Sequence, residues 1–373
     1  MRSICTTALI VSAVALPRAL SAQAVPRDST PVLTLGVFVD GYFAWDRNRP
    51  APPDRAFTTQ AVRHNEFNVN LAHLSLGVEQ ARVRARFTAQ AGTSVQSNYA
   101  SEPADGAISG PSVSQHIQEA YVGVQAAQTL WIDGGIFFSP VGFESWISSD
   151  NPTYTRSFTA DYTPYYLSGV RATWQPVSRV TATMQVVNGW QIISERNAGK
   201  ALVARVDVAA SDRLALGAST FIGEEQPRGG GARARQFGQL LAKLTPRAGT
   251  ELWLTADGGL EDGREEPSRR WWSVTAIGRQ RLSDAVSLSL RTERYGDPRG
   301  VLIPLGEGLG GPMFSGGSTG IDVRIPGGAL WRVEARYVRA DQRVFPSGAG
   351  ARPTRDNVTV TTSLALRAEH RVR

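Results

Sequence analysis

Hydrophobic and polar residues alternate along most of this chain. The clearest segment is residues 81–91, where Ala81, Val83, Ala85, Phe87, Ala89 and Ala91 share one face and Arg82, Arg84, Arg86, Thr88 and Gln90 the other. The same two-residue period recurs around residues 180–186, 286–293 and 331–337. A period of two is the register of a pleated strand, whose side chains point alternately to opposite faces. The pattern therefore predicts an all-β protein.

The connections between these strands alternate strictly between short and long. Short turn-like breaks fall at 79–80, 126–128, 176–178, 209–212, 246–249, 283–284 and 326–328. Long polar or Gly/Pro-rich stretches fall at 46–64, 94–114, 139–164, 188–199, 223–234, 257–269, 295–316 and 340–354. Seven short and eight long connections predict sixteen strands. Between Asn65 and Val78 the apolar phase slips, since Phe67 and Leu71 face opposite to Leu74 and Val78, so 14 or 18 strands stay open.

Such a rhythm is typical of an outer-membrane barrel, which has short periplasmic turns and long extracellular loops on an even number of antiparallel strands. A closed barrel also satisfies every backbone polar group in lipid. We therefore expect a transmembrane, antiparallel, up-and-down β-barrel. Aromatic residues near the strand ends fit its two interfacial girdles: Tyr42, Phe43, Trp45, Trp131, Phe137, Phe138, Trp174, Trp190, Trp253, Trp271, Trp272 and Trp331. A soluble all-β core is the alternative, but the apolar faces carry Ala and Val rather than large core residues.

The N-terminus has the layout of a secretory signal peptide. Arg2 precedes an apolar stretch from Ala8 to Leu16, and Ala22-Gln23-Ala24 is a small-x-small cleavage site. We expect residues 1–24 to be removed and residues 25–373 to form one barrel domain. Cleavage lowers the formal charge from +7 to +5 and removes Cys5, the single cysteine, so no disulfide or cysteine chemistry is expected in the mature protein. The predicted location is the bacterial outer membrane.

Arginine dominates the face that would line the lumen. The pore-lining candidates are Arg82, Arg84, Arg86, Arg171, Arg205 and Arg336. Lumenal acids, among them Glu119, Asp133, Glu293 and Glu334, indicate that part of this wall is paired and solvated. A sixteen-stranded barrel is wide enough for an aqueous channel, and a net positive lining concentrates anions.

Several stretches resemble the putative β-barrel porin-2, OmpL-like family of bacterial outer-membrane proteins. They are His64 to Leu74, Val83 to Thr93, Gln115 to Gly123, Trp131 to Phe137, Gly142 to Arg171 and Val187 to Gln191. The resemblance covers roughly residues 35–225 and implies a fold and a compartment more than a substrate. Barrels of this kind usually end on an aromatic residue that the barrel-assembly machinery reads, but this chain ends with Glu369 to Arg373. Either the last strand, about 355–367, is followed by a short tail, or the assembly signal is weakened.

The strand and loop order also resembles general diffusion porins, which fold their third loop into the barrel opposite an arginine row. That resemblance implies constriction-loop candidates in 139–164: Glu144, Asp150, Arg156 and Asp161. The three acids would then face Arg82, Arg84 and Arg86. The alternative, in which the loop caps the outer surface and the arginines pair along the wall, is equally consistent with the sequence.

Signals for catalysis or cofactors are weak. The histidines are His64, His73, His116 and His370, and a Ser-His-acid triad needs a spatial proximity that the sequence does not show. Asp150, Asn151 and Asp161 could hold Ca²⁺, but Asp and Asn are ordinary turn residues and that interpretation is favoured. No enzyme activity, cofactor or metal is expected.

The predicted function is therefore a porin, a passive channel for small hydrophilic solutes with a mild anion preference. Its expected partners are outer-membrane lipid, lipopolysaccharide, the barrel-assembly machinery and the solutes themselves. A homotrimer is inferred only by analogy with general porins, and no nucleic acid is expected. The competing function is a non-conducting barrel that acts as a scaffold or surface-interaction protein through its long loops.

Overall fold

The computed structural model describes residues 30–104, 110–195, 197–225, 231–263, 267–306 and 310–373. The expected signal peptide, residues 1–24, lies outside the described residues. The described chain forms sixteen strands. They are β1 (Val32–Asp46), β2 (Phe67–Gln80), β3 (Val83–Ala91), β4 (Ile117–Ala127), β5 (Leu130–Phe138), β6 (Tyr166–Val177), β7 (Val180–Val187), β8 (Ala201–Ser211), β9 (Leu214–Glu225), β10 (Arg233–Arg247), β11 (Thr250–Asp262), β12 (Arg269–Arg281), β13 (Val286–Gly296), β14 (Met313–Ile325), β15 (Ala329–Ala340) and β16 (Asp356–Val372).

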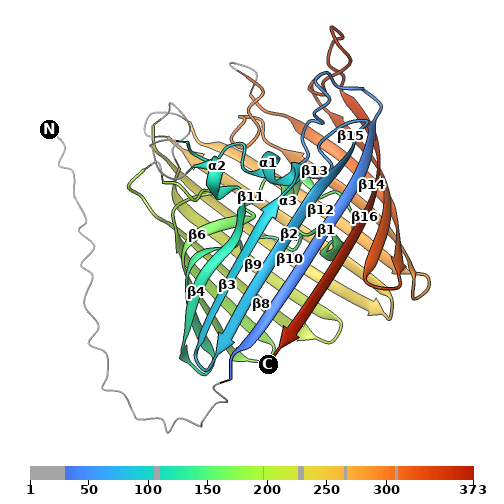
Figure 1. The fold of residues 1–373 in the computed structure, drawn as a ribbon. Coiled ribbons are helices and arrows are strands. Elements are labelled where there is room, and N and C mark those ends of the chain that lie inside the picture. Colours follow the sequence, from blue (N-terminus) through green and yellow to red (C-terminus); the bar gives the residue numbers. More distant parts are fainter. Residues whose placement is uncertain (1–29, 105–109, 196, 226–230, 264–266, 307–309) are drawn as a thin grey trace, which may run out of the picture.

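Each strand pairs antiparallel with its sequence neighbours, and β1 pairs with β16 to close the barrel. Short turns gather at one end and long loops at the other (Figure 1). The long loops are named L1 (47–66), L2 (92–116), L3 (139–165), L4 (188–200), L5 (226–232), L6 (263–268), L7 (297–312) and L8 (341–355). The expected count of sixteen strands and the alternation of connections are confirmed.

Within the described residues, four short helical segments lie in the loops: α1 (Thr93–Asn98) and α2 (Pro111–Ser114) in L2, and η1 (Ser148–Asp150) and α3 (Phe158–Asp161) in L3. In the described part of the chain, no helix has both the length and the apolar character needed to cross a membrane.

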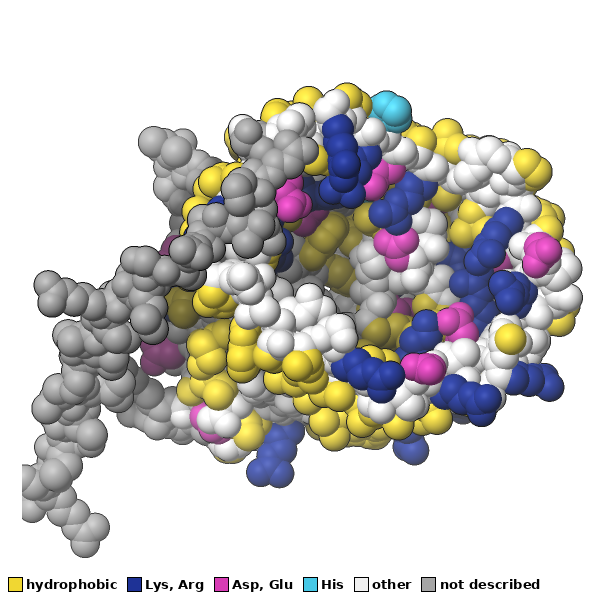
Figure 2. Space-filling view, turned by 90° about the horizontal axis from the view of Figure 1, so that it is seen from below, with side chains coloured by type: hydrophobic (Ala, Val, Ile, Leu, Met, Phe, Trp, Pro, Cys, Tyr) yellow, Lys and Arg dark blue, Asp and Glu magenta, His cyan; other side chains and the backbone are white. Residues whose placement is uncertain are grey.

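The two faces of the barrel wall differ in polarity, as the alternation predicts. Large apolar side chains on the outer face are exposed, for example Leu74 at 65%, Leu240 at 67% and Leu290 at 67%. The inward positions of the same strands carry His73, Gln239 and Arg291, which are buried. Figure 2 looks into the short-turn end and shows a hollow with Lys, Arg, Asp and Glu on its wall and hydrophobic side chains around the outside. An apolar surface of this extent is stable against lipid rather than water.

The phase slip in the sequence of β2 is a β-bulge within one strand. Asp40 of β1 pairs with Leu71, and the next residue, Gly41, pairs with Val69, so Asn70 is an extra residue. Asn70 and Leu71 are both fully buried, whereas Val69 and Leu74 on either side are exposed. An extra residue shifts the side-chain alternation by one, which returns the apolar set to the outer face.

Two other expectations are corrected. The last strand does not stop near residue 367, because β16 continues to Val372, which pairs with Leu33 of β1. The aromatic residues do not all belong to girdles: Trp45, Trp174 and Trp331 are exposed, but Tyr42, Phe137, Trp253 and Trp271 are buried. The buried group sits at inward positions of its strands, where it packs against loops that enter the barrel.

Candidate functional site

The third long loop, L3, lies inside the barrel. Ser148, Arg156 and Phe158 are 0–1% exposed, a degree of burial that a loop capping the outer surface could not give. L3 contacts inward-facing residues around most of the wall, from Arg205 on β8 and Gln239 on β10 to Arg332 on β15 and Asp40 on β1. The lumen is therefore a site built from the wall and one loop that crosses it.

A buried set of charges on β13 and β15 fastens the middle of L3. Glu334 accepts hydrogen bonds from the backbone N–H of Thr155 at 2.6 Å and from its hydroxyl at 2.8 Å. Arg291 donates to the Thr155 carbonyl at 2.5 Å and to Glu334 at 3.1 Å. The side chains of Arg291 and Glu334 are 0% and 2% exposed. Charges this desolvated need complete pairing, so these contacts fix the loop against the wall.

Two further arginines extend this attachment. Arg332 donates to the carbonyls of Ser148 at 2.6 Å and Asn151 at 3.0 Å, and is paired with Asp322 on β14 at 2.8 Å. Arg336 is paired with Glu293 at 2.8 Å, and the same Glu293 accepts from the backbone N–H of Phe158 at 2.8 Å. The sequence placed Arg336 and Glu293 on a solvated lumenal wall, whereas in the structure L3 covers both and leaves them at most 5% exposed.

The first part of L3 is held at the opposite wall. Arg205 donates to the carbonyls of Pro140 at 2.6 Å and Gly142 at 2.7 Å. Gln239 accepts from the backbone N–H of Gly142 at 2.7 Å. Arg205 is itself oriented by Asp207, two residues along β8, at 2.6 Å. Arg205 therefore acts in this structure as a loop anchor on the wall.

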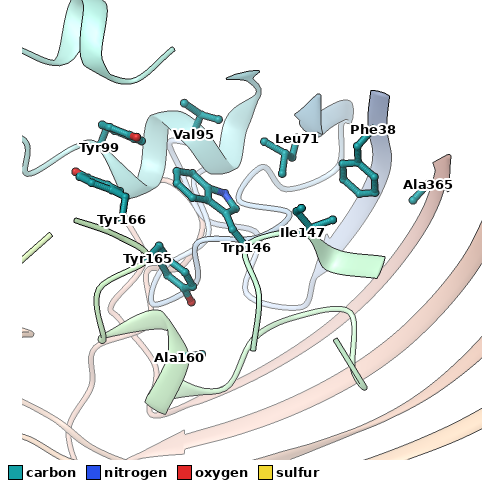
Figure 3. Packing of buried hydrophobic residues seen from close by; sticks show 10 residues of the cluster. All are labelled: Phe38, Leu71, Val95, Tyr99, Trp146, Ile147, Ala160, Tyr165, Tyr166 and Ala365. Atoms are coloured by element: carbon teal, nitrogen blue, oxygen red, sulfur yellow. The ribbon is translucent and has the colours of Figure 1, made fainter. Parts of the chain in front are cut away.

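An aromatic cluster joins L3 to L2 and β6 (Figure 3). Trp146 of L3 is 1% exposed and lies among Tyr165, Tyr166 and Tyr99, the residue that follows α1 in L2. Tyr99 and Tyr166 stack with ring centroids 4.3 Å apart. The indole N–H of Trp146 donates to Ser94 Oγ at 3.0 Å, which satisfies its one polar atom. Burying aromatic rings of this size stabilises the loop core substantially.

A second loop, L1, also enters the barrel, which the sequence did not indicate. Gln60 is fully buried and donates to the Trp146 carbonyl at 3.1 Å. Thr59 donates to Asp161 of α3 at 2.5 Å and accepts a hydrogen bond from Arg156. The L3 partners of Gln60 and Thr59 lie more than 80 residues away along the chain, so the sequence showed the length of L1 but not these contacts.

The expected arginine row is present in part. Arg84 forms a two-pronged pair with Asp133 on β5, both contacts at 2.7 Å, and Arg86 pairs with Glu119 on β4 at 2.6 Å. Arg171 on β6 binds the same Asp133 at 2.9 Å. Arg82 lies outside the strand, exposed in the turn between β2 and β3.

The acids of L3 do not face this row, so the expected pairing across the lumen is wrong. Glu144 accepts hydrogen bonds from the hydroxyl and the backbone N–H of Ser157, within L3 itself. Asp150 pairs with Arg367 on β16 at 2.7 Å. Asp161 lies 3.4 Å from Arg156. Arg84 and Arg86 pair instead with acids of the wall itself, Asp133 on β5 and Glu119 on β4.

Exposure separates the lumenal arginines into two groups. Arg291, Arg332 and Arg336 are 0–5% exposed and are occupied by L3. Arg84, Arg86 and Arg171 keep 26%, 31% and 15% of their side-chain surface in solvent. Arg84, Arg86 and Arg171 can therefore meet a solute without displacing protein.

Burial changes the acidity of the loop carboxyls. It raises the pKa of Glu144 to about 7, because desolvation outweighs the attraction of Arg291 and the hydrogen bonds from Ser157. The pKa of Asp161 is raised by the same cause, against the attraction of Arg156. Asn151 accepts from the Ser145 N–H at 2.6 Å and donates to its carbonyl at 2.8 Å, which is turn chemistry rather than calcium ligation.

The closed sixteen-stranded barrel with an inward third loop defines the class of protein as a porin-type outer-membrane barrel. The chain belongs to the family described as "Putative beta-barrel porin-2, OmpL-like", whose model matches residues 32–367, and it is an outer-membrane protein of that family. The resemblance found in the first part of the sequence therefore extends over almost the whole barrel.

Solved structures agree with this fold. The anion-selective porin from Comamonas acidovorans is 10% identical with a TM-score of 0.61, covering 91% of this chain and 100% of that one. OmpT of Vibrio cholerae, in a trimer form, is 8% identical with a TM-score of 0.60, covering 91% and 99%. The outer membrane channel DcaP of Acinetobacter baumannii is 11% identical with a TM-score of 0.57, covering 90% and 97%. A search of curated proteins finds no match.

Proposed function

We propose that this porin is a passive diffusion channel for small hydrophilic solutes with a mild preference for anions. The observation that carries the preference is the partly exposed cluster of Arg84, Arg86 and Arg171 with Asp133 and Glu119. Three arginines against two carboxylates leave one positive charge in excess. A local potential of about 1 kT would enrich anions roughly threefold at this point of the path.

The geometry of the pairs leaves donors for a passing anion. Arg84 uses Nε and Nη2 on Asp133, and Arg86 uses Nε on Glu119, so a guanidinium N–H of each side chain stays outside its carboxylate pair. Arg84 also lies over the ring of Trp131, 4.3 Å from its centroid, which holds the group in place. A fixed, partly hydrated guanidinium can exchange water for an anion at small cost.

The test is the reversal potential of the mature chain in planar bilayers under a KCl gradient. Wild-type channels should prefer chloride, and the variant Arg84→Ala/Arg86→Ala/Arg171→Ala should lose that preference or favour potassium. Arg179→Ala is the matched control, because Arg179 is 61% exposed and pairs with Asp212 outside the cluster. An unchanged chloride preference in the triple variant would refute the role of the cluster.

A second function, a non-conducting barrel that works as a scaffold through its loops, is favoured by one observation. L1, L2 and L3 pack together in the lumen around Trp146 and Gln60, both at most 1% exposed. A folded barrel that shows β-type circular dichroism and a heat-modifiable gel shift but no conductance steps would support the scaffold and refute the channel.

The proposal also covers export, membrane assembly and oligomeric state, as expected for an outer-membrane protein. Residues 1–24 act as a signal peptide, and residues 25–373 form one domain without enzyme activity, cofactor or metal. The barrel-assembly machinery inserts it beside lipid and lipopolysaccharide. A homotrimer is the proposed assembly, supported by OmpT, whose fold is similar and which has a trimer form. Chemical crosslinking in detergent tests it, since only monomeric bands would count against a trimer.

A further inference from the structure

Three arginines lie on the outer wall of the barrel, where β12, β13 and β15 reach the long-loop end. Arg270, Arg294 and Arg339 are exposed and stand at the second residue of β12, the third-last of β13 and the second-last of β15. These strands and β14 are neighbours in the wall (Figure 1). The adjacent residues Tyr295 and Val338 point inward and are at most 6% exposed, so Arg294 and Arg339 point outward.

Two of these arginines flank one short side chain. Arg294 of β13 and Arg339 of β15 both lie directly opposite Ser315 of β14, which is exposed. Neighbouring strands are about 4.8 Å apart, so the two arginine backbones are about 10 Å apart across β14. Arginine side chains are long enough to converge over Ser315 from both sides. Two guanidinium forks with a hydroxyl between them are suited to the oxygens of one phosphate group.

An aromatic ring holds Arg294 at the wall and leaves its donors available. The guanidinium carbon lies 5.9 Å from the centroid of the Trp272 ring on β12. Trp272 is paired with Gly296, and its ring occupies the space of the missing side chain, since a Cβ at Gly296 would lie 2.7 Å from the indole nitrogen. Among the described residues, Arg294 has no carboxylate partner, so its N–H groups are free to bind an anion.

Two acids near this edge are already engaged. Asp356 on β16 accepts a hydrogen bond from the Tyr337 hydroxyl at 2.9 Å and pairs with Arg339 at 3.3 Å, with the Arg339 side chain 59% exposed. Asp341 in L8 accepts from the backbone N–H of Met313 at 3.0 Å. Because so exposed an ion pair is weak, Arg339 can bind a second anion beside Asp356. The outward positions of β12 to β15, all of which the structure describes, carry no Asp or Glu.

The same strands become apolar below the arginines, toward the short turns. Leu290, Ile321 and Trp331 are exposed on the outer face of β13, β14 and β15. The surface therefore has a positive zone at the loop end and an apolar zone beside it. Since long loops of such barrels face the cell exterior, the arginines lie at the level of the outer-leaflet headgroups. An amphiphile with a phosphate head and acyl chains matches both zones, whereas a simple anion matches only the first.

We propose that Arg294, Arg339 and Ser315 bind a phosphate group of a lipopolysaccharide molecule whose acyl chains pack on the outer face of β13 to β15. The lipid-anchored part of that molecule, lipid A, is a phosphorylated disaccharide with several acyl chains. Arg270 adds positive charge at the same edge. The inference goes beyond the channel function, because this surface lies outside the barrel and binds lipid whether or not the lumen conducts.

The experiment measures binding of purified lipid A to the refolded mature chain in detergent by native mass spectrometry. Wild type should bind lipid A saturably and should bind a dephosphorylated form at least about tenfold more weakly. Arg294→Ala/Arg339→Ala should raise the dissociation constant for lipid A roughly 25-fold, about fivefold for each arginine. Arg294→Gln alone, which keeps a polar side chain of similar shape, should raise it about fivefold.

Arg213→Ala is the matched control. Arg213 is an exposed arginine in the short turn between β8 and β9, at the opposite end of the barrel. The control should bind lipid A like wild type, and a heat-modifiable gel shift shows that each variant is folded.

Four results would overturn the inference. Equal binding of lipid A by wild type and the double variant would exclude the arginines, and equal binding of dephosphorylated lipid A would exclude the phosphate. Inorganic phosphate that binds as tightly as lipid A would assign the site to a free anion. Loss of crosslinked oligomers in the double variant, with lipid binding unchanged, would assign this face to another copy of the chain. None of these results depends on conductance, so the channel proposal is tested separately.

Discussion

Replacing Glu334 by Ala should release L3 from the wall. Glu334 accepts two hydrogen bonds from Thr155, at 2.6 and 2.8 Å, and one from Arg291 at 3.1 Å, with its side chain 2% exposed. Losing one partner of a buried pair costs roughly 3–5 kcal/mol. Arg291 keeps a second carboxylate, Glu293, at 3.3 Å, so the lower end of this range applies.

The expected loss of about 3 kcal/mol would raise the undocked fraction of L3 on the order of a hundredfold. Trypsin can measure that fraction, because Arg156 is the single Lys or Arg between residues 139 and 165 and is 0% exposed when the loop is docked. When reclosing is faster than cutting, the cleavage rate follows the open population. Cleavage between Arg156 and Ser157 should therefore accelerate by about the same factor.

Glu251→Ala is the matched control. Glu251 also pairs with a lumenal cation, Lys243, at 2.7 Å, but both side chains are 33–40% exposed and L3 is not involved. An exposed pair of this kind is worth at most about 1 kcal/mol. If Glu334→Ala and Glu251→Ala are cut at the wild-type rate alike, the buried charges do not hold L3, and this reasoning is refuted.

Three further predictions concern the loop and the wall. Burial raises the pKa of Glu144 from 4.5 to about 7, so between these pH values the folded protein binds more protons than the unfolded chain. The free energy of unfolding should therefore fall by about 3 kcal/mol as the pH rises from 4.5 to 7. Glu144→Gln should abolish this pH dependence of the gel-shift midpoint between about pH 5 and 8, and a variant that keeps the pH dependence would contradict the prediction. Trp146→Ala should cost about 3–5 kcal/mol of loop packing and increase current noise in bilayers, with quiet channels as the opposing result. Leu290→Arg places a charge on the 67% exposed outer face and should lower barrel stability by about 2–4 kcal/mol, whereas Leu290→Ile should not; equal gel-shift midpoints would argue against a lipid-facing position.

Much of the architecture could be predicted because it depends on local pattern. The alternation of side chains shows which face of a strand meets lipid, and the alternation of connection lengths shows which end of the barrel holds the loops. Even the slip at Asn70 and Leu71 was visible in the sequence, although only the pairing with Asp40 shows that it is a bulge rather than a change in strand number.

The site was harder to predict, because its contacts join residues far apart in the chain. Arg84 and Arg86 could be placed in the lumen, but their partners, Asp133 and Glu119, depend on the register of the next strands. The assignment of Glu144 and Asp161 to those arginines failed because it came from loop order alone. L3 instead reaches Thr59 of L1 and Glu334 of β15.

The sequence by itself determined the barrel, its strand count within two, the lipid-facing residues and the arginine-rich lining. These properties follow from the two-residue period and from the need to satisfy every backbone group in lipid. The tertiary structure decided which arginines stay in solvent, which are buried under L3, and that L1 packs against L3 inside the barrel. Those outcomes depend on which distant side chains the closed barrel and its inward loops bring together. Because an unpaired charge is costly once it is buried, the contacts that pair every buried charge determine where the loops lie.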